Sequence, residues 1–208
     1  TIIQAAQALY DLLWRDYCDW YVEYSKHVPE SHKAQTAAVL QAVLETSLRL
    51  LHPIMPFVTE ELWQHLRNQQ ATSDSIMVAP WPKAEKRWLD ADAERQFELF
   101  QAVVTAIRNT RAELHVPLEA KPQVRLASQQ GKMREFFDAH RPFVQALAHV
   151  GEVAVEATAT KTRDAAATVV DGIEIIMPLA GLIDAARERQ RLQLRVDEIN
   201  QELARLVA

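Results

Sequence analysis

Residues Leu50–Trp63 read LLHPIMPFVTEELW and predict two helices separated by a sharp break. The helix before the break ends ahead of Pro53, because proline lacks an N–H donor and clashes with the preceding turn. A second helix is predicted to begin after Pro56, with Thr59 as its N-cap. The two glutamates that follow Thr59 suit the positive end of the helix dipole. This pattern indicates helices that are bounded by prolines.

Helices of the same kind are predicted on both sides of this break. The first 130 residues contain no glycine, and all four glycines come later. A long stretch of Ala, Leu, Gln, Glu and Arg without glycine favours helix. Apolar spacing places helices at roughly residues 3–26, 31–51 and 91–114. We therefore expect residues 1–118 to form a helical bundle.

The pattern changes beyond the prolines at 117 and 122. Alternating residues predict short strands near 123–126 and 152–156, and a helical segment between them is interrupted at Pro142. Asp171-Gly172 sits between two apolar runs and predicts a hairpin with a type I′ turn. Residues 119–181 are thus expected to be a small α+β subdomain of three or four strands. Apolar residues at steps of 3 and 4 over 182–208 predict the start of a coiled coil.

Composition excludes several kinds of protein. The chain has 208 residues, with 23 Lys+Arg against 28 Asp+Glu and a formal net charge of −5, which argues against coating nucleic acid by bulk charge. The single cysteine, Cys18, rules out a disulfide framework within the chain and is expected to be buried. No apolar run is long enough to span a membrane, and no signal peptide is visible. Because the chain begins at Thr1 and stops within a heptad pattern, we expect a piece of a larger intracellular protein.

The sequence shows no motif for catalysis. No two glycines are close enough for a phosphate-binding loop, no metal-ligand spacing occurs among the histidines, and no nucleophile-elbow motif is present. We therefore expect no catalytic residue and no metal or cofactor site in this chain. Its features are those of a binding and packing module.

Six of the fifteen aromatic residues, including every tyrosine, lie between residues 10 and 24. Exposed rings beside Arg15 and Lys26 would stack on unpaired bases, as in proteins that bind RNA loops. The alternative is that the rings fill a helical core. We favour the core for any single ring and exposure for at least one member of the cluster.

Arg111 occupies a position of the 91–114 helix where an apolar residue is expected, one turn after Arg108. An isolated buried charge is costly, so its guanidinium must be paired or close to solvent. An ion pair with an acidic residue and a contact with a phosphate or base are equally compatible with the spacing.

The order of the motifs resembles a known family. The stretch 50–63 resembles the helix–kink–helix signature of the anticodon-binding domain of class I aminoacyl-tRNA synthetases of the valine/isoleucine/leucine group. Four further segments resemble bacterial valyl-tRNA synthetases, and they occur in that family's order: residues 19–26, 80–82, 107–113 and 178–184.

This resemblance implies that the chain is the C-terminal part of an ATP-dependent ligase that charges tRNA(Val) with valine. The family's nucleotide-binding signatures are absent here, so ATP and Mg²⁺ would belong to a catalytic domain outside the chain. The implied partner is tRNA(Val), without a membrane. The implied compartment is the cytoplasm, and the parent enzyme is expected to be monomeric.

The resemblance and the aromatic cluster together give a set of predicted tRNA-binding residues: Trp14, Arg15, Tyr17, Lys26, Arg108 and Arg111. One departure from the family is the stretch 116–121, where the usual paired prolines and lysines are missing, so we assign that loop no contact. Two alternatives remain: a helical protein-interaction module, or the equivalent domain of an isoleucyl- or leucyl-tRNA synthetase.

Overall fold

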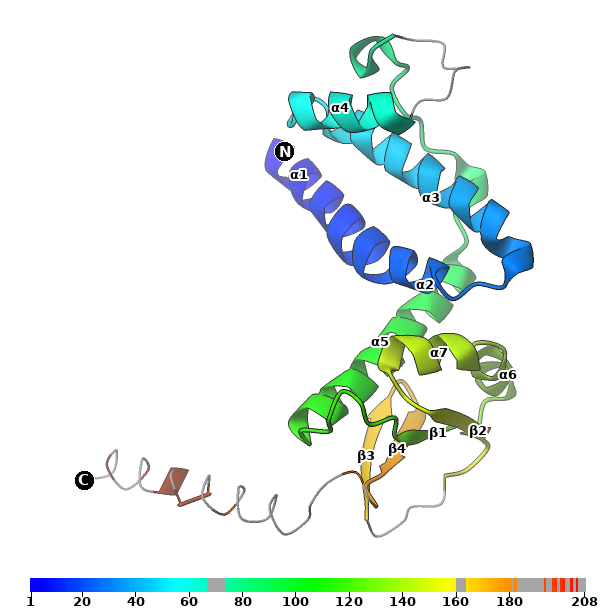
Figure 1. Ribbon diagram of the computed structural model, residues 1–208, viewed down its shortest axis with the longest axis vertical. Helices are drawn as coiled ribbons and strands as arrows, with labels where there is room; N and C mark the ends of the chain where they lie inside the picture. The colour runs from blue at the N-terminus through cyan, green and yellow to red at the C-terminus, as the bar shows by residue number, and fades with distance from the viewer. Residues whose placement is uncertain are drawn as a thin grey trace. The chain divides into compact units, whose positions relative to one another are not determined.

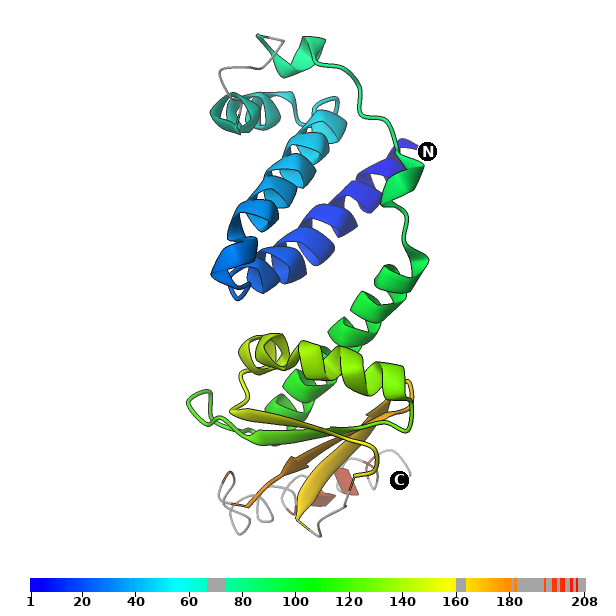
Figure 2. The same cartoon turned by 90° about the vertical axis from the view of Figure 1, so that its right-hand side faces the viewer.

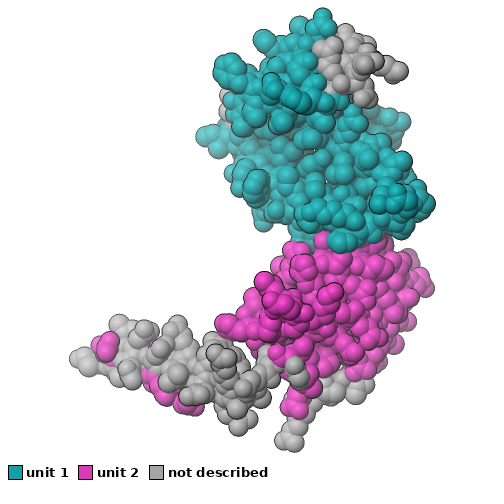
Figure 3. All heavy atoms as spheres, in the orientation of Figure 1, with its two compact units in different colours: residues 1–95 teal, residues 96–208 magenta. Residues whose placement is uncertain are grey.

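The computed structural model describes residues 1–66, 74–159 and 164–180 (Figure 1), together with residues 182, 193, 196, 197, 199, 200, 203 and 205. The contacts divide the chain into two compact units, unit 1 at residues 1–95 and unit 2 at residues 96–208 (Figure 3). The coiled coil predicted for 182–208 lies largely outside the described residues, and the domain borders predicted near 118 and 181 stay predictions.

Unit 1 begins with a helical rod. It consists of α1 (Ile2–Tyr10), η1 (Asp11–Val22) and α2 (Glu23–Ser25), which follow one another without a break (Figure 1). The Thr1 side chain caps the first turn in a capping box with Gln4. The helix predicted over residues 3–26 is confirmed in extent. Its middle section, η1, is π-helical rather than α-helical, which the steps of 3 and 4 did not predict.

The proline-bounded helices are confirmed as α3 (Glu30–Leu51) and α4 (Pro56–Leu66). They enclose a small core of Leu48, Trp63 and Ile76. The prediction that Thr59 caps α4 is wrong. Thr59 lies buried inside the helix, where its hydroxyl donates to the Met55 carbonyl at 2.8 Å.

Glu60 connects α4 to the segment that follows residue 74. Its carboxylate accepts hydrogen bonds from the Ser75 hydroxyl at 2.8 Å and from the backbone N–H of Ile76 at 3.2 Å. Hydrogen bonds from the Gln64 side chain, and then from Ser75 and Ile76, lower the pKa of Glu60. The segment contains two short 3₁₀ turns, η2 (Ile76–Val78) and η3 (Lys86–Trp88).

Unit 2 takes in most of α5 (Ala91–Glu113), which matches the helix predicted over 91–114. Behind it come β1 (Gln123–Ala127), α6 (Gly131–Ala139), α7 (Arg141–Ala148), β2 (Glu152–Glu156), β3 (Ala165–Val170) and β4 (Ile173–Pro178). The predicted break at Pro142 is confirmed, since this proline lies in the first turn of α7. The fold class is confirmed as mainly helical with a small α+β part.

The four strands form one mixed sheet in the order β2-β1-β4-β3, with β1 parallel to β2 and antiparallel to β4. Helices α6 and α7 lie on one face of it (Figures 1 and 2). The predicted hairpin is β3–β4, and its turn residues Asp171 and Gly172 have φ of 46° and 79°, as a type I′ turn requires. The interior of unit 2 is much larger than that of unit 1, with Phe100, Ile107 and Phe137 among its fully buried side chains.

Candidate nucleic-acid interface

Two aromatic rings stand exposed on the rod of unit 1. Tyr10, at the end of α1, and Trp14, in η1, are 56% and 58% exposed. Their ring centroids lie 6.4 Å apart with an interplanar angle of 14°, so the rings stack on each other. The prediction that at least one ring of the cluster is exposed is confirmed. Such a pair presents aromatic surface to solvent next to charged side chains.

The two predicted cations of unit 1, Arg15 and Lys26, are also exposed. Arg15 lies 3.7 Å from the Asp11 carboxylate, and the Lys26 ammonium lies 2.5 Å from Glu23. Both are ion pairs between neighbouring turns at the surface, where each contributes at most about 1 kcal/mol. A phosphate group could therefore replace either carboxylate at little cost.

Tyr17 has a different environment from Trp14. Its side chain is buried, and its hydroxyl donates to the Leu40 carbonyl of α3 at 2.9 Å. Burial is the main cause that raises the pKa of Tyr17. The structure therefore places Tyr17 between two helices, where it holds the rod against α3 and its ring is not presented to a ligand.

The structure also separates the two predicted arginines of α5. Arg111 is buried and donates hydrogen bonds to four backbone carbonyls. The acceptors are Ala148 at 3.0 Å, His149, Pro117 at 3.1 Å and Ala120 at 3.1 Å.

These bonds answer the question that the sequence left open about Arg111. Its guanidinium is paired neither with an acidic side chain nor with solvent, because carbonyl oxygens at the end of α7 and in the 117–120 loop surround it. Burial lowers the pKa of Arg111. A direct contact with RNA does not fit this position, and we assign Arg111 to the fold of unit 2.

Arg108 is exposed, and its Nε donates to the Leu147 carbonyl at 2.8 Å. Leu147 lies in the last turn of α7, where a cation is stabilising because it meets the negative end of the helix dipole. Arg108 thus belongs to unit 2, whereas Trp14, Arg15 and Lys26 belong to unit 1.

Sequence reasoning missed two exposed tryptophans and misplaced the cysteine. Trp81 and Trp88 are 60% and 71% exposed, and the Arg87 guanidinium lies 5.1 Å from the centroid of the Trp88 ring. The prolines on either side of Trp81 were the available signal, since they prevent a helix that would bury the ring. Cys18 was expected to be buried, and it is exposed on η1.

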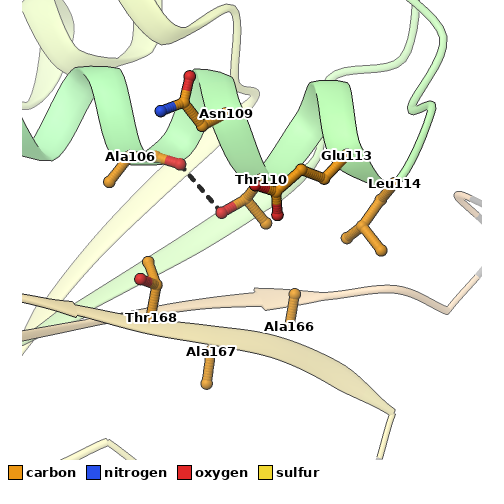
Figure 4. Close-up of a pocket in the computed structure, with 8 residues that line it drawn as sticks. All are labelled: Ala106, Asn109, Thr110, Glu113, Leu114, Ala166, Ala167 and Thr168. Carbon is orange, nitrogen blue, oxygen red and sulfur yellow. Dashed lines mark hydrogen bonds between the residues drawn. The ribbon is translucent and has the colours of Figure 1, made fainter. Parts of the chain in front are cut away.

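A pocket of about 340 Å³ lies in unit 2 between α5 and β3 (Figure 4). Its walls contain small side chains, such as Ala106 and Ala166, and one carboxylate, Glu113. Thr110 faces it, with its hydroxyl bonded to the Ala106 carbonyl at 2.9 Å. Among the described residues, the side chains that line this pocket include no lysine or arginine.

Among the described residues, no group of three or more His, Cys, Asp or Glu side chains could hold a metal ion. Within the same residues, no helix combines the length and the apolar character that crossing a bilayer needs.

Comparison with known proteins gives a family match and several relatives. Residues 2–126 match the family described as "Anticodon-binding domain of tRNA ligase". The valine–tRNA ligase of Bacillus licheniformis is 35% identical over 195 residues, which cover 91% of this chain and 22% of that protein. The valine–tRNA ligases of Enterococcus faecalis and Bacillus subtilis are 33% and 32% identical, and each alignment covers 98% of this chain and 23% of the relative.

Proposed function

We propose, since the chain belongs to the family of anticodon-binding domains of tRNA ligases, that it binds the anticodon stem-loop of tRNA(Val) as part of a valine–tRNA ligase. The chain spans just over a fifth of the length of the relatives it matches. Attachment of valine, with ATP and Mg²⁺, is accordingly proposed for a part of the ligase outside this chain.

The observation that supports this proposal best is the stacked pair of Tyr10 and Trp14. Anticodon bases are unpaired, and proteins hold such bases on aromatic side chains. The Trp14 ring is more than half exposed and Tyr10 already holds it in a defined orientation, so less side-chain freedom is lost on binding. We propose that Trp14 stacks on a base of the anticodon loop.

The proposed roles of the cations follow from their exposure. Arg15 and Lys26 are placed to meet phosphates, because each exchanges a weak surface ion pair for a charge-assisted bond. Arg108 is a third candidate, on unit 2. Tyr17 and Arg111 support binding only indirectly, by holding the helices and loops in place.

The decisive measurement is the affinity of the chain for fluorescent tRNA(Val), followed by anisotropy at several salt concentrations. Loss of one base stack corresponds to about 1–3 kcal/mol, so Trp14→Ala should weaken binding about 5- to 150-fold. Trp88→Ala is the matched control, since Trp88 is also more than half exposed in unit 1 but lies outside the rod. Equal effects of the two substitutions, with unchanged circular dichroism, would remove Trp14 from the proposal.

Two further comparisons separate the alternatives. Arg15→Ala should reduce the slope of affinity against salt by about one charge. Tighter binding to tRNA(Ile) or tRNA(Leu) than to tRNA(Val) would transfer the proposal to another ligase of the group. No saturable binding to any tRNA, together with self-association in gel filtration, would favour a protein-interaction module.

A further inference from the structure

Strand β3 lies at an edge of the sheet and directs backbone groups away from it. The order of the strands gives β3 one neighbour, β4. The N–H of Leu179 donates to the carbonyl of Asp164 at 2.9 Å, so these two residues form a hydrogen-bonded pair of the antiparallel ladder. Such pairs recur at every second residue, so the even-numbered residues of β3 bond to β4. Three odd-numbered residues point their N–H and C=O groups outward: Ala165, Ala167 and Val169.

This edge lacks the features that keep natural strands from pairing with other chains. Its sequence, AAATVV, contains no charged residue and no proline, and its register with β4 is continuous, without a bulge. Ala167 is exposed, and Val169 is 64% exposed. Among the residues that the structure describes, β4 is the one strand that pairs with β3. An edge of this kind is a template for a further strand.

The pocket between α5 and β3 follows this edge. Ala166 and Thr168 point from β3 toward α5, whereas Ala167 points away from the helix (Figure 4). Ala106 lies over Thr168, and Glu113 lies over Ala166 (Figure 4). The end of α5 therefore runs along the strand. Because side chains alternate along a strand, every second side chain of a strand added to β3 would face this part of α5.

The charge of the pocket indicates which side chain it would accept. Glu113 is exposed, and the ion pairs within the described part of the chain do not include it. It is also the last residue of α5, where the negative end of the helix dipole adds to its charge. A cationic side chain would therefore be stabilised beside Glu113, and a phosphate group would be repelled.

We propose that unit 2 binds an extended basic segment of another protein, which adds to the edge of β3 as a strand and places a lysine or arginine beside Glu113. Hydrogen bonds to the outward backbone groups of β3 supply affinity, and the pocket supplies selectivity for the side chain, as in peptide recognition by strand addition. A second copy of this chain fits less well, since β3 itself has no basic residue to place beside Glu113. The site contains none of the residues proposed to bind tRNA, so the inference does not depend on the proposed function.

The test measures binding of synthetic peptides to the 208-residue chain by fluorescence anisotropy. The probe is a labelled peptide of about six residues, the length of an ordinary strand, which alternates valine and threonine around a central lysine. Its control has glutamate in place of the lysine. The lysine probe should bind saturably, and the glutamate probe should bind about fivefold more weakly, because an attractive surface pair is replaced by a repulsive one.

A charge exchange tests the assignment of Glu113. Glu113→Lys should reverse the preference, so that this variant binds the glutamate probe more tightly than the lysine probe. Glu98→Lys is the matched control, since Glu98 is also exposed on α5 but does not line the pocket. This control variant should keep the preference of the parent, which separates a contact at Glu113 from the net charge of the chain.

A second pair of measurements tests strand addition itself. Ala167→Pro removes an outward N–H and leaves the hydrogen bonds between β3 and β4 in place, so the chain should fold and bind the lysine probe about tenfold more weakly. N-methylation of the probe backbone should weaken binding by a similar factor, because it removes the donors of the added strand. Since the methylated probe is used with the unaltered chain, the test holds even where the proline variant fails to fold.

Each outcome supports or overturns the proposal. Saturable binding of the lysine probe, a reversed preference in Glu113→Lys and loss of affinity on N-methylation support it. No binding, equal binding of the two probes, or binding that survives N-methylation overturns it. Self-association of the chain that Ala167→Pro abolishes identifies a second copy as the occupant and also overturns it. Affinity for tRNA(Val), measured on the same variants, should not change, so failure of this inference and failure of the proposed function are distinguishable.

Discussion

Replacing Arg111 by methionine should destabilise unit 2 strongly, although the change removes a buried charge. Four hydrogen bonds from the guanidinium to carbonyls would be lost. Each bond to a charged donor contributes about 1.5–3 kcal/mol. Two effects reduce the total loss. Removal of the charge also removes its desolvation cost, and the part-buried carbonyls of His149, Pro117 and Ala120 can bond to water instead. We expect a net loss of about 3 kcal/mol in the free energy of unfolding, or roughly 10 °C in the midpoint.

The assay is urea and thermal unfolding followed by far-ultraviolet circular dichroism. Arg108→Met is the control, because Arg108 is exposed and water can replace its bond to the Leu147 carbonyl, so it should cost about 1–2 kcal/mol, less than Arg111→Met. Arg111→Lys keeps the charge, but the lysine ammonium cannot reach all four carbonyl acceptors. The stability of this variant should therefore lie between that of the parent and that of Arg111→Met. An Arg111→Met protein within 1 kcal/mol of the parent would show that the carbonyls are satisfied without the guanidinium, and the reasoning would fail.

Three further predictions concern stability. The pKa of Glu60 is lowered in the folded state, so its contribution is present above its ordinary value of 4.5 and is lost as pH falls through the folded value. Glu60→Gln should therefore lower the thermal midpoint at pH 7, and the difference from the parent should shrink in a series from pH 5 to pH 3; a constant difference contradicts this. Gly151→Ala should lower the free energy of unfolding in urea by about 1–3 kcal/mol, because the new Cβ would lie 2.8 Å from the carbonyl oxygen of Lys121. Gly131→Ala is the control and should be neutral or stabilising, since its new Cβ meets only the flexible Arg134 side chain at 3.8 Å. Tyr17→Phe should cost about 1 kcal/mol and leave tRNA affinity unchanged, and a large loss of affinity in a stable protein would restore Tyr17 as a contact residue.

The elements of the fold were predictable from local signals. Proline marks the ends of α3 and the start of α4, and the Asp171-Gly172 pair marks the hairpin, because these residues restrict the backbone wherever they occur. The π-helical section and the buried Thr59 were not predictable. The spacing of apolar residues along one helix does not report the backbone hydrogen-bond pattern of η1 or the local bonds of the Thr59 hydroxyl to Met55 and Pro56.

The candidate site was predictable only as a region. The exposure of at least one ring of the aromatic cluster was predicted correctly, and its contact with RNA stays a prediction. The sequence could not tell which ring faces α3, so it ranked Tyr17 with Trp14. The anomaly at Arg111 was real, but its acceptors at Ala148 and His149 lie 37 and 38 residues away. Backbone carbonyls carry no signature in the sequence, so only the fold reveals them.

The position of β1 in the middle of the sheet has a consequence for the order of folding during synthesis. β1 lies between β2 and β4, and its register pairs Leu126 with Val155 on one side and Ile175 on the other. A nascent chain on the ribosome therefore completes unit 1 first, while β1 must wait for β4 to emerge. The family match ends at residue 126, inside this strand, so a polypeptide cut there would carry β1 with neither neighbour and would invite aggregation.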